Sequence, residues 1–248
     1  MSGYFRPQSP LTPTVGVVLV FGSLAVLSIV AIVLAAITLT PEDSEAAPGG
    51  TRSTIRISDE IDAVFIGDSY TQGVGASGPE SRWVTLVARM EGWEPHNLGR
   101  SGTGYLAAGA PSECGHLKCL NYVETIPLVV AAKPDFVFVS GGQSDFETFL
   151  KDPRSVIRAI DTTYTSLRAG LPDTPIYAIG PSTTETATKQ NLEFDNAVRS
   201  AAARVGATYV SLLQPNVIKP TFIAADRAYV NDAGFAAIAA RVEESIKK

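Results

Sequence analysis

The sequence has little positive charge and only two histidines. Its 248 residues contain 20 Lys and Arg against 25 Asp and Glu, which gives a net charge of −5 at pH 7. No run of Lys or Arg interrupts this acidic balance. A domain that binds nucleic acid usually presents a basic face, so we exclude nucleic acid as the expected partner.

Charged residues of either sign are also scarce, at 18% of the chain, whereas hydrophobic residues reach 45%. This shortage indicates a segment that never meets water, in addition to a large core. The sequence has no internal repeat, which excludes a repeat architecture. The length fits one domain of ordinary size with additional segments, or two small domains.

One segment lacks charged residues completely. Residues 15–39 contain no Asp, Glu, Lys or Arg, and this run exceeds the roughly 20 residues that cross a bilayer core as a helix. A buried core helix would be shorter and amphipathic, and the apolar part of a cleaved signal peptide typically spans only about 7–15 residues. The sequence therefore predicts an uncleaved transmembrane anchor at residues 14–40.

The charges on either side of this anchor predict its orientation. Arg6 precedes the apolar run, whereas three acidic residues follow it before the next basic one. Because positive charge stays on the cytoplasmic side, we expect residues 1–13 to be cytoplasmic and the protein to be a single-pass membrane protein with an extracytoplasmic domain. Residues 41–58, rich in Pro, Gly, Ser and Thr, are predicted to be a linker, and residues 59–248 the folded domain.

The two cysteines, Cys114 and Cys119, lie close together in the sequence CGHLKC. An oxidising compartment would let them form a disulfide. Because this disulfide closes a very short loop, we expect it to shape the loop more than it stabilises the domain. A metal site built from Cys114, His116 and Cys119 lacks an evident fourth ligand. We expect a disulfide, no metal and no cofactor.

From about residue 61 onward, short apolar runs alternate with amphipathic segments. The apolar runs are typical of buried strands, expected at residues 63–67, 96–99, 135–142, 175–181 and 207–211. The amphipathic segments predict helices at residues 79–90, 123–132, 154–168, 192–205 and 232–246. This alternation predicts an α/β fold with a five-stranded parallel sheet and helices on both faces.

Glycine-rich turns follow the first four of these strands, with the sequences GDS, GRSGTG, GGQSD and GPS. In open parallel sheets the ligand binds at the carboxyl ends of the strands. The convergence of these turns at one edge therefore predicts a functional site there, lined by the loops at residues 100–122 and 212–230.

Ser69 follows the first strand and lies between Gly67 and Gly73. A strand-to-helix turn exposes a side chain at the top of the sheet, where flanking backbone N–H groups can stabilise a developing oxyanion. The alternative is a serine that only caps a helix N-terminus. The turn by itself leaves both interpretations open.

Four segments together are more specific than this turn. GDSYTQG, NLGRSGTG, GGQSD and DRAYVNDAGF occur in the order and spacing of the four motif blocks of the SGNH (GDSL-type) hydrolases. The resemblance extends over residues 62–242. It implies a three-layer α/β/α, flavodoxin-like fold and a family of esterases, lipases, acyl-sugar deacetylases and acyltransferases.

The resemblance assigns a role to each matching residue. Ser69 matches the nucleophile, and the backbone N–H groups of Ser69 and Gly99 match two arms of the oxyanion hole. The third arm is normally an asparagine, but Ser144 stands in its place, next to Gln143. A serine hydroxyl is shorter than an amide, and removing one such donor can cost about 3 kcal/mol in the transition state.

The last block departs further from the family pattern. Asp226 matches the acid, and Asn231 and Gly234 match the residues that follow the base, but Tyr229 occupies the histidine position. A phenol is protonated near neutral pH, so it donates a hydrogen bond but hardly accepts a proton. Loss of the base commonly lowers the rate by several orders of magnitude.

Only two histidines could replace the missing base. His96 lies in the second predicted strand, so we interpret it as structural. His116 lies in the loop between the cysteines, on the same side of the sheet as Ser69, and is either a displaced base or a solvent-facing loop residue.

Two functions remain after these observations. The first is an atypical hydrolase that acts on ester or acyl groups of envelope material, with a small acyl ester or an acylated glycan as ligand. The second is an inactive domain that binds a glycan, an acyl ligand or a protein. Acyl transfer would use the same nucleophile and would suffer equally from the missing base.

Overall fold

The structure is a computed structural model that describes residues 60–115, 117–225 and 229–247. The chain divides into two units, residues 1–55 and 56–248, and every described residue belongs to the second. The predicted anchor at residues 14–40 and the linker at residues 41–58 lie outside the described residues. In the three described ranges, no helix is both long and apolar enough to span a membrane.

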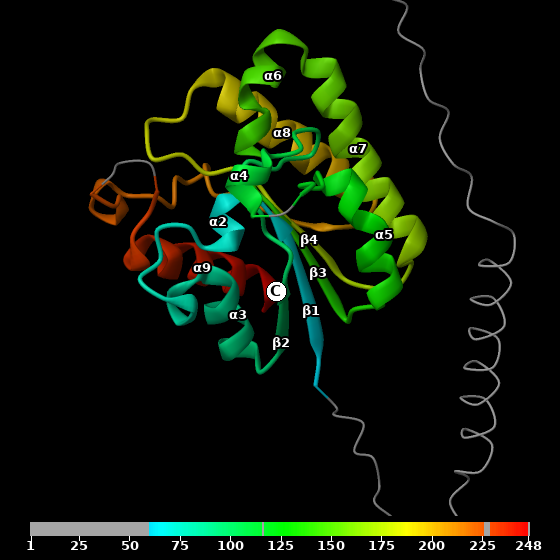
Figure 1. Ribbon diagram of the computed structural model, residues 1–248, viewed down its shortest axis with the longest axis horizontal. Helices are drawn as coiled ribbons and strands as arrows, with labels where there is room; N and C mark the ends of the chain where they lie inside the picture. Colours follow the sequence, from blue (N-terminus) through cyan, green and yellow to red (C-terminus); the bar gives the residue numbers. More distant parts are fainter. Residues whose placement is uncertain (1–59, 116, 226–228, 248) are drawn as a thin grey trace, which may run out of the picture. The chain divides into compact units, whose positions relative to one another are not determined.

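The second unit is built on one parallel sheet of five strands (Figure 1). The strands are β1 (Asp62–Gly67), β2 (Glu94–Asn97), β3 (Phe136–Ser140), β4 (Ile176–Ile179) and β5 (Thr208–Val210), and their order is β2-β1-β3-β4-β5. The predicted α/β fold with a five-stranded parallel sheet is confirmed. β2 begins two residues earlier than expected and contains Pro95, which lacks an N–H donor and is tolerated because β2 lies at the sheet edge.

Helices cover both faces of this sheet. α3 (Trp83–Glu91) and α9 (Asp232–Ile246) cover one face, and α5 (Tyr122–Ala132), α7 (Pro153–Gly170) and α8 (Lys189–Arg204) cover the other. Alternate residues of β1 face opposite layers, since Phe65 packs with the first group of helices and Ile66 with the second. This is why the inner strands β1, β3 and β4 are apolar over most of their length rather than alternating with polar residues.

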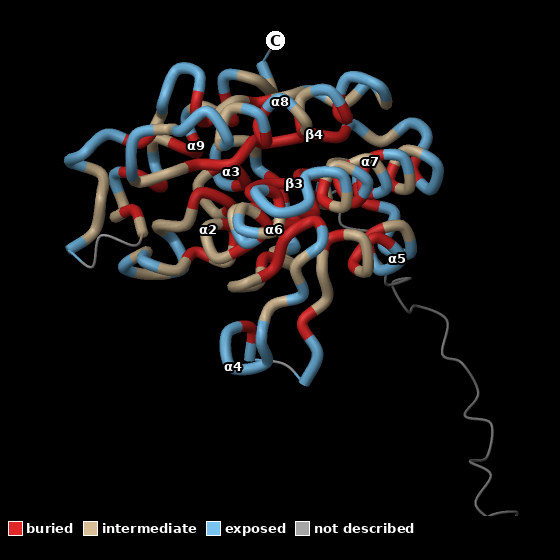
Figure 2. The backbone as a smooth tube through the Cα atoms, turned by 90° about the horizontal axis from the view of Figure 1, so that it is seen from above, coloured by how far each residue is buried: buried red, intermediate tan, exposed pale blue. Residues whose placement is uncertain are grey.

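Several short elements were not predicted from the sequence. They are α2 (Ser69–Gln72), α4 (Pro111–Cys114), α6 (Phe146–Lys151) and three 3₁₀ turns at Pro79–Ser81, Gln143–Asp145 and Pro220–Phe222. The helix expected at residues 79–90 is divided, because Arg82 is extended between the first 3₁₀ turn and α3. α4 lies in an exposed excursion that projects from the body of the domain (Figure 2).

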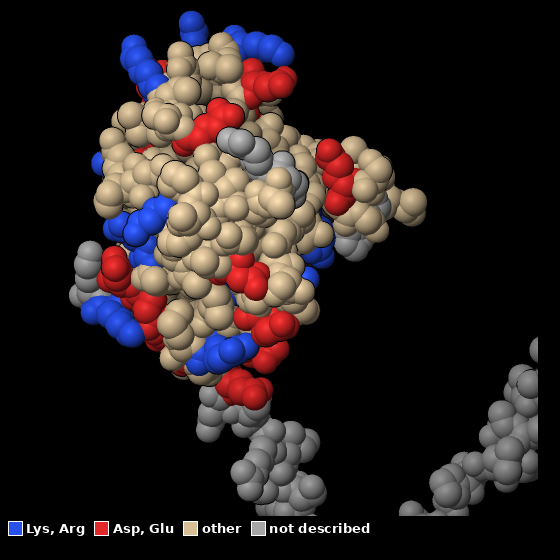
Figure 3. Space-filling model, turned by 90° about the vertical axis from the view of Figure 1, so that its left-hand side faces the viewer, with Lys and Arg blue, Asp and Glu red and all other residues tan. Residues whose placement is uncertain are grey.

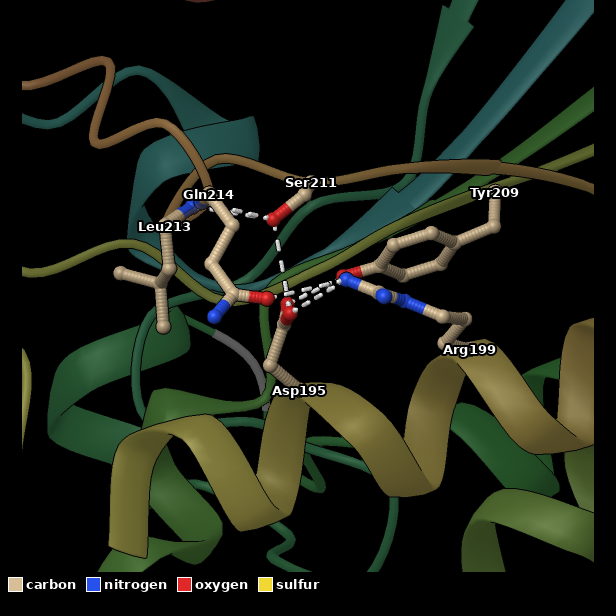
Figure 4. A network of polar contacts seen from close by, with 6 residues as sticks. All are labelled: Asp195, Arg199, Tyr209, Ser211, Leu213 and Gln214. Carbon is tan, nitrogen blue, oxygen red and sulfur yellow. Dashed lines mark hydrogen bonds and ion pairs between the residues drawn. The ribbon is translucent and has the colours of Figure 1, made fainter. Parts of the chain in front are cut away.

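A buried carboxylate joins α8 to the other edge strand, β5 (Figure 4). Asp195 accepts hydrogen bonds from the hydroxyls of Tyr209 and Ser211 and lies 3.5 Å from the guanidinium of Arg199. Burial raises the pKa of Asp195, and the three donors act in the opposite direction. Because Ser211 also accepts the N–H of Gln214 at 2.9 Å, this network fixes the start of the segment that leads toward the last motif block.

Candidate active site

The turn that carries Ser69 is closed by contacts between strand and helix. Ser69 is the first residue of α2, directly after β1. A Cβ atom on Gly67 would lie 2.0 Å from Oγ1 of Thr71, so only glycine lets α2 pack on the end of the strand. The hydroxyl of Ser69 is half-buried and makes no hydrogen bond to a described residue. The turn therefore presents this hydroxyl at the carboxyl edge of the sheet.

Asp68, not Ser69, caps the short helix. Its Oδ1 accepts the N–H of Tyr70 at 3.0 Å and its Oδ2 accepts the N–H of Gly142 at 3.1 Å. The interpretation of Ser69 as an N-cap serine is therefore wrong, because the preceding aspartate already has that position. Ser69 is left free of a capping role.

The carboxyl of Asp68 is only 2% exposed. Burial raises the pKa of Asp68 to about 6, although the N–H groups that donate to it lower the pKa in part. The space for this carboxyl depends on Gly141, which has a φ of +94° and whose added Cβ would lie 2.2 Å from Oδ2 of Asp68. The glycine turn after β3 thus holds the aspartate next to the nucleophile position.

The segment after β2 wraps around α2. The backbone N–H and the hydroxyl of Ser101 both donate to Oε1 of Gln72, at 2.7 and 2.8 Å. The N–H of Gly99 donates to Oδ1 of Asn97 at 2.8 Å, so this N–H is already engaged. The backbone N–H groups of Ser69 and Gly102 have no acceptor among the described residues. Gly102 follows Ser101, which binds Gln72 of α2, so both N–H groups belong to segments that pack at the turn of Ser69.

Gly102 was missed in the sequence, although a signal was present. It has a φ of +75°, in the left-handed region that favours glycine. The segment GRSGTG contains three glycines, and the resemblance alone did not show which of their N–H groups is free. The N–H of Gly99 donates to Asn97 and that of Gly104 donates to the carbonyl oxygen of Ala107 at 2.9 Å, which leaves the N–H of Gly102.

The third block places its polar side chains in different directions. Gln143 donates from Nε2 to Oγ of Ser182 at 3.1 Å, while its Oε1 is buried without a hydrogen-bond partner in the described structure. Ser144 is exposed. The amide of Gln143 therefore joins the turns after β3 and β4 rather than serving as a free donor.

Asp145, which sequence reasoning left without a role, holds the second loop in place. It is fully buried and accepts the N–H groups of Ala107 at 2.7 Å and Leu106 at 3.3 Å. Burial raises the pKa of Asp145, and these backbone donors oppose the shift. Asp145 thereby links the block after β3 to the block after β2.

The last block reaches the nucleophile turn through its tyrosine. The ring centroids of Tyr229 and Tyr70 lie 6.1 Å apart, and Tyr70 directly follows Ser69. The carbonyl oxygen of Tyr229 accepts the N–H of Ala224 at 2.9 Å. Asn231 then caps α9 by accepting the N–H of Gly234 at 3.2 Å. The predicted acid, Asp226, lies outside the described residues.

The two histidines have different outcomes. His96 lies on β2, and its Nε2 is 2.9 Å from Oδ1 of Asp62, the first residue of β1. This places His96 at the opposite end of β1 from Ser69, in a half-exposed pair. His116, the predicted displaced base, lies outside the described residues.

Cys114 and Cys119 form a disulfide, with their Cα atoms 6.0 Å apart. The expected pairing is thus confirmed, and it removes both thiolates from any metal site. Over the described parts of the chain, no group of three or more His, Cys, Asp or Glu side chains is arranged to hold a metal ion.

Residues 65–237 match the family model of the GDSL-like lipase/acylhydrolase family. No curated protein sequence matches this chain closely enough to count as a relative.

Solved structures share the fold. TesA has 18% sequence identity and a TM-score of 0.58, over 75% of this chain and 98% of its own. A two-domain esterase, CEX, active on acetylated mannans, has 16% identity and a TM-score of 0.56, over 76% of this chain and 48% of its own.

A variant of Axe2, an acetyl-xylooligosaccharide esterase from Geobacillus, has 18% identity and a TM-score of 0.51, over 76% of this chain and 94% of its own. At these identities the likeness shows a common fold. The family model covers most of the domain, including the turn of Ser69 and the start of α9. The chain belongs to the GDSL-like lipase/acylhydrolase family.

Proposed function

We propose that this chain is a membrane-anchored, extracytoplasmic hydrolase that acts slowly on ester or acyl groups of envelope material. One observation carries the proposal. The half-buried hydroxyl of Ser69 stands at a turn held by Asp68, with the N–H groups of Ser69 and Gly102 free of acceptors. A hydroxyl with adjacent free N–H donors is the arrangement that acyl transfer to a serine requires.

In this proposal Oγ of Ser69 attacks the carbonyl carbon of the ester, and the N–H groups stabilise the negative charge that develops on the carbonyl oxygen. The ester C–O bond then breaks and the alcohol leaves with a proton, after which water hydrolyses the acyl-serine and restores Ser69. The proton of Ser69 must leave as Oγ attacks. Tyr229 stands at the position of the base, and a phenol is a poor proton acceptor near neutral pH. We therefore expect acylation of Ser69 to be slow, with a rate that rises when a better base is supplied.

A hollow of about 510 Å³ offers a place for the acyl group or its alcohol. Phe146, Phe149 and Leu150 of α6 form its apolar side, and the segment at residues 183–191 after β4 forms its polar side. Both segments begin at the carboxyl edge of the sheet, as Ser69 does. Mixed apolar and polar walls fit an acylated glycan, which joins a small apolar group to a polyhydroxylated ring.

An uncharged ligand fits the described charges. Much of the described surface seen from the side of α2 and α9 carries neither Lys, Arg, Asp nor Glu (Figure 3), and Glu185 is the charged residue among the described ones that line the hollow. The acetylated mannans and acetyl-xylooligosaccharides of CEX and Axe2 are ligands of this kind. The extracytoplasmic placement rests on the uncharged run at residues 15–39 and its flanking charges.

A second candidate function is that of a binding module without turnover. The packing of Tyr229 against Tyr70 favours it, because the position of the base is filled by a side chain with a structural contact. In that case the same hollow would hold an acylated glycan that is never hydrolysed.

A fluorophosphonate probe separates the two functions. The full chain, reconstituted in lipid nanodiscs, is incubated with the probe beside the variants Ser69→Ala and Ser144→Ala. Labelling that is lost in Ser69→Ala and kept in Ser144→Ala supports a nucleophile. A folded wild-type protein that takes no label, with no hydrolysis of p-nitrophenyl acetate above the Ser69→Ala background, contradicts the hydrolase and favours the binding module.

A further inference from the structure

An apolar trough runs along the outer side of the edge strand β2. It consists of two hollows of about 220 and 200 Å³ that share Leu98 and Leu128 as lining residues. Its other apolar walls come from Cys119 and Leu120 at one end and from Val129, Ala132 and Pro134 at the other. The trough therefore follows the groove between β2 and α5, away from the hollow beside α6.

One end of this trough lies beside the nucleophile turn. Arg100 lines the first hollow, and its backbone N–H donates to the carbonyl oxygen of Gly67 at 2.9 Å. The other end reaches Asp62, at the start of β1. A ligand in the trough would thus lie along the sheet edge, with one end near the carboxyl ends of the strands.

The guanidinium of Arg100 is half-buried and carries an uncompensated charge. One of its five N–H donors meets the carbonyl oxygen of Gly99 at 2.7 Å. In the described parts of the chain it has no carboxylate within ion-pair distance. Lys118 also lines the hollow but already pairs with Glu124 at 2.8 Å. The positive charge available to a ligand is therefore that of Arg100.

The floor of the trough is apolar surface that water contacts. Leu128 of α5 is 58% exposed, and Leu98 and Leu120, which line the same hollow, are half-buried. Covering apolar surface is favourable in proportion to the area removed from water, and a hydrogen bond to a charged group adds a separate gain. A free small anion would obtain only the second gain, and a neutral hydrocarbon only the first.

We propose that this trough binds a single-chain anionic amphiphile, with its acidic head on Arg100 and its hydrocarbon chain over Leu98 and Leu128. The site needs no chemistry at Ser69, so it goes beyond the proposed hydrolase activity. The Cys114–Cys119 disulfide contributes one wall, because Cys119 lines the end of the trough where the head lies.

Photoaffinity labelling of the full chain in nanodiscs of zwitterionic lipid tests this site. The probes are a diazirine analogue of decanoic acid and the matching analogue of decanol, and mass spectrometry locates the labelled residues. We expect the acid to label residues 117–134 and the alcohol to label them about tenfold less, the factor that corresponds to one charged hydrogen bond.

Variants distinguish this site from the others. Arg100→Gln and Leu128→Asp should each reduce labelling by the acid about tenfold, whereas Leu150→Asp, on the exposed side of α6, should leave it unchanged. Labelling should persist in Ser69→Ala, which separates this site from a failure of the proposed hydrolase.

Several outcomes would overturn the site. These are equal labelling by acid and alcohol, label at residues 146–150 that Leu150→Asp removes, or dependence on Ser69. Absence of label, together with disulfide crosslinking of two chains in the variant Leu128→Cys, would show a dimer surface instead. Leu128 is exposed on the surface of α5, so Leu128→Asp keeps the test decisive if Arg100→Gln fails to fold.

Discussion

The turn at Gly67–Gly73 and the segment at Tyr229–Gly234 meet at the same edge of the sheet but differ in what they contribute. The turn is held by a buried carboxylate, a direct contact between helix and strand, and the glycines after β3. The segment is held by an N-cap, a backbone bridge and an aromatic contact. Both are well anchored. The turn has the serine of the family motif at position 69, whereas the segment has Tyr229 where the family motif has histidine.

In the proposed hydrolase, this difference means that the frame of the site persists while the group at the base position is replaced. Tyr229 is bulkier than histidine, and its ring packs against Tyr70 rather than leaving an empty space. The backbone around it keeps the hydrogen bonds that begin α9. A substitution at this position should therefore change chemistry more than stability.

The largest expected effect comes from restoring the base. Tyr229→His places an imidazole, whose ordinary pKa lies near 6.5, where the family has its proton acceptor. Since general base catalysis contributes roughly 10²- to 10⁴-fold, hydrolysis of p-nitrophenyl acetate should rise by at least about 100-fold. Steady-state rates at pH 7.5 measure the effect.

The matched control is Tyr70→His, which places the same side chain on the neighbouring ring of the pair. This control should show no comparable gain, and Ser69→Ala combined with Tyr229→His should remove the gain. A rate that is unchanged in Tyr229→His would contradict our placement of the base.

An intermediate effect comes from the carboxylate that supports the turn. The pKa of Asp68 in the folded protein is raised to about 6 from an ordinary value of 3.8, so the folded state holds this proton more tightly than the unfolded state. Stability is therefore highest below about pH 4 for this group and falls as the pH rises from 4 to 6. The loss is on the order of 3 kcal/mol, at 1.36 kcal/mol per pKa unit.

Asp68→Asn should abolish this part of the pH dependence. Urea unfolding at several pH values between 4 and 7 measures it as the difference between wild type and variant. Asp145 and Asp195, which also have raised pKa values, are present in both proteins and cancel in that difference. Parallel stability curves for the two proteins would show that Asp68 does not titrate as proposed.

The smallest effect tests the other side of the comparison. Asn231→Ala removes the N-cap of α9 and the hydrogen bond from its Nδ2 to the carbonyl oxygen of Thr221, 3.1 Å away. The expected loss is about 1 kcal/mol of unfolding free energy. In the Tyr229→His background it should also lower the recovered rate, because the cap orients the start of α9 beside position 229.

Asp152→Ala is the matched control, since Asp152 caps α7 in the same way and lies outside the hollow beside α6. This control should cost a similar free energy and leave the recovered rate unchanged. If both variants lowered the rate equally, the effect would come from general destabilisation rather than from the last block.

Sequence patterns predicted the layers of this fold because apolar periodicity reports burial. The run AVFIG gave β1 to within one residue, and α9 was predicted with its observed bounds. α6 was missed, because its six residues are too few to show a helical period. The 3₁₀ turn before α3 was merged with that helix, because a proline at a helix start looks the same in both cases.

The candidate site was predicted in its residues but not in its hydrogen bonds. The spacing of the blocks identified Ser69, Gly99, Ser144 and Tyr229 as candidates. It could not show that the N–H of Gly99 is taken by Asn97, or that the amide of Gln143 binds Ser182. Such bonds join groups on different segments, and their geometry depends on how the loops pack.

The sequence by itself determined the alternation of strands and helices, the order of the motif blocks and the identity of the residue at position 229. Each of these follows from the local pattern of apolar and polar residues or from the spacing of the motifs along the chain. Only the tertiary structure decided that Asp68 is the cap, that Tyr229 packs against Tyr70, and that Arg100 opens onto an apolar trough. These contacts join segments far apart in the chain, and they exist only once the sheet brings its carboxyl ends and its edge strand β2 together with the helices.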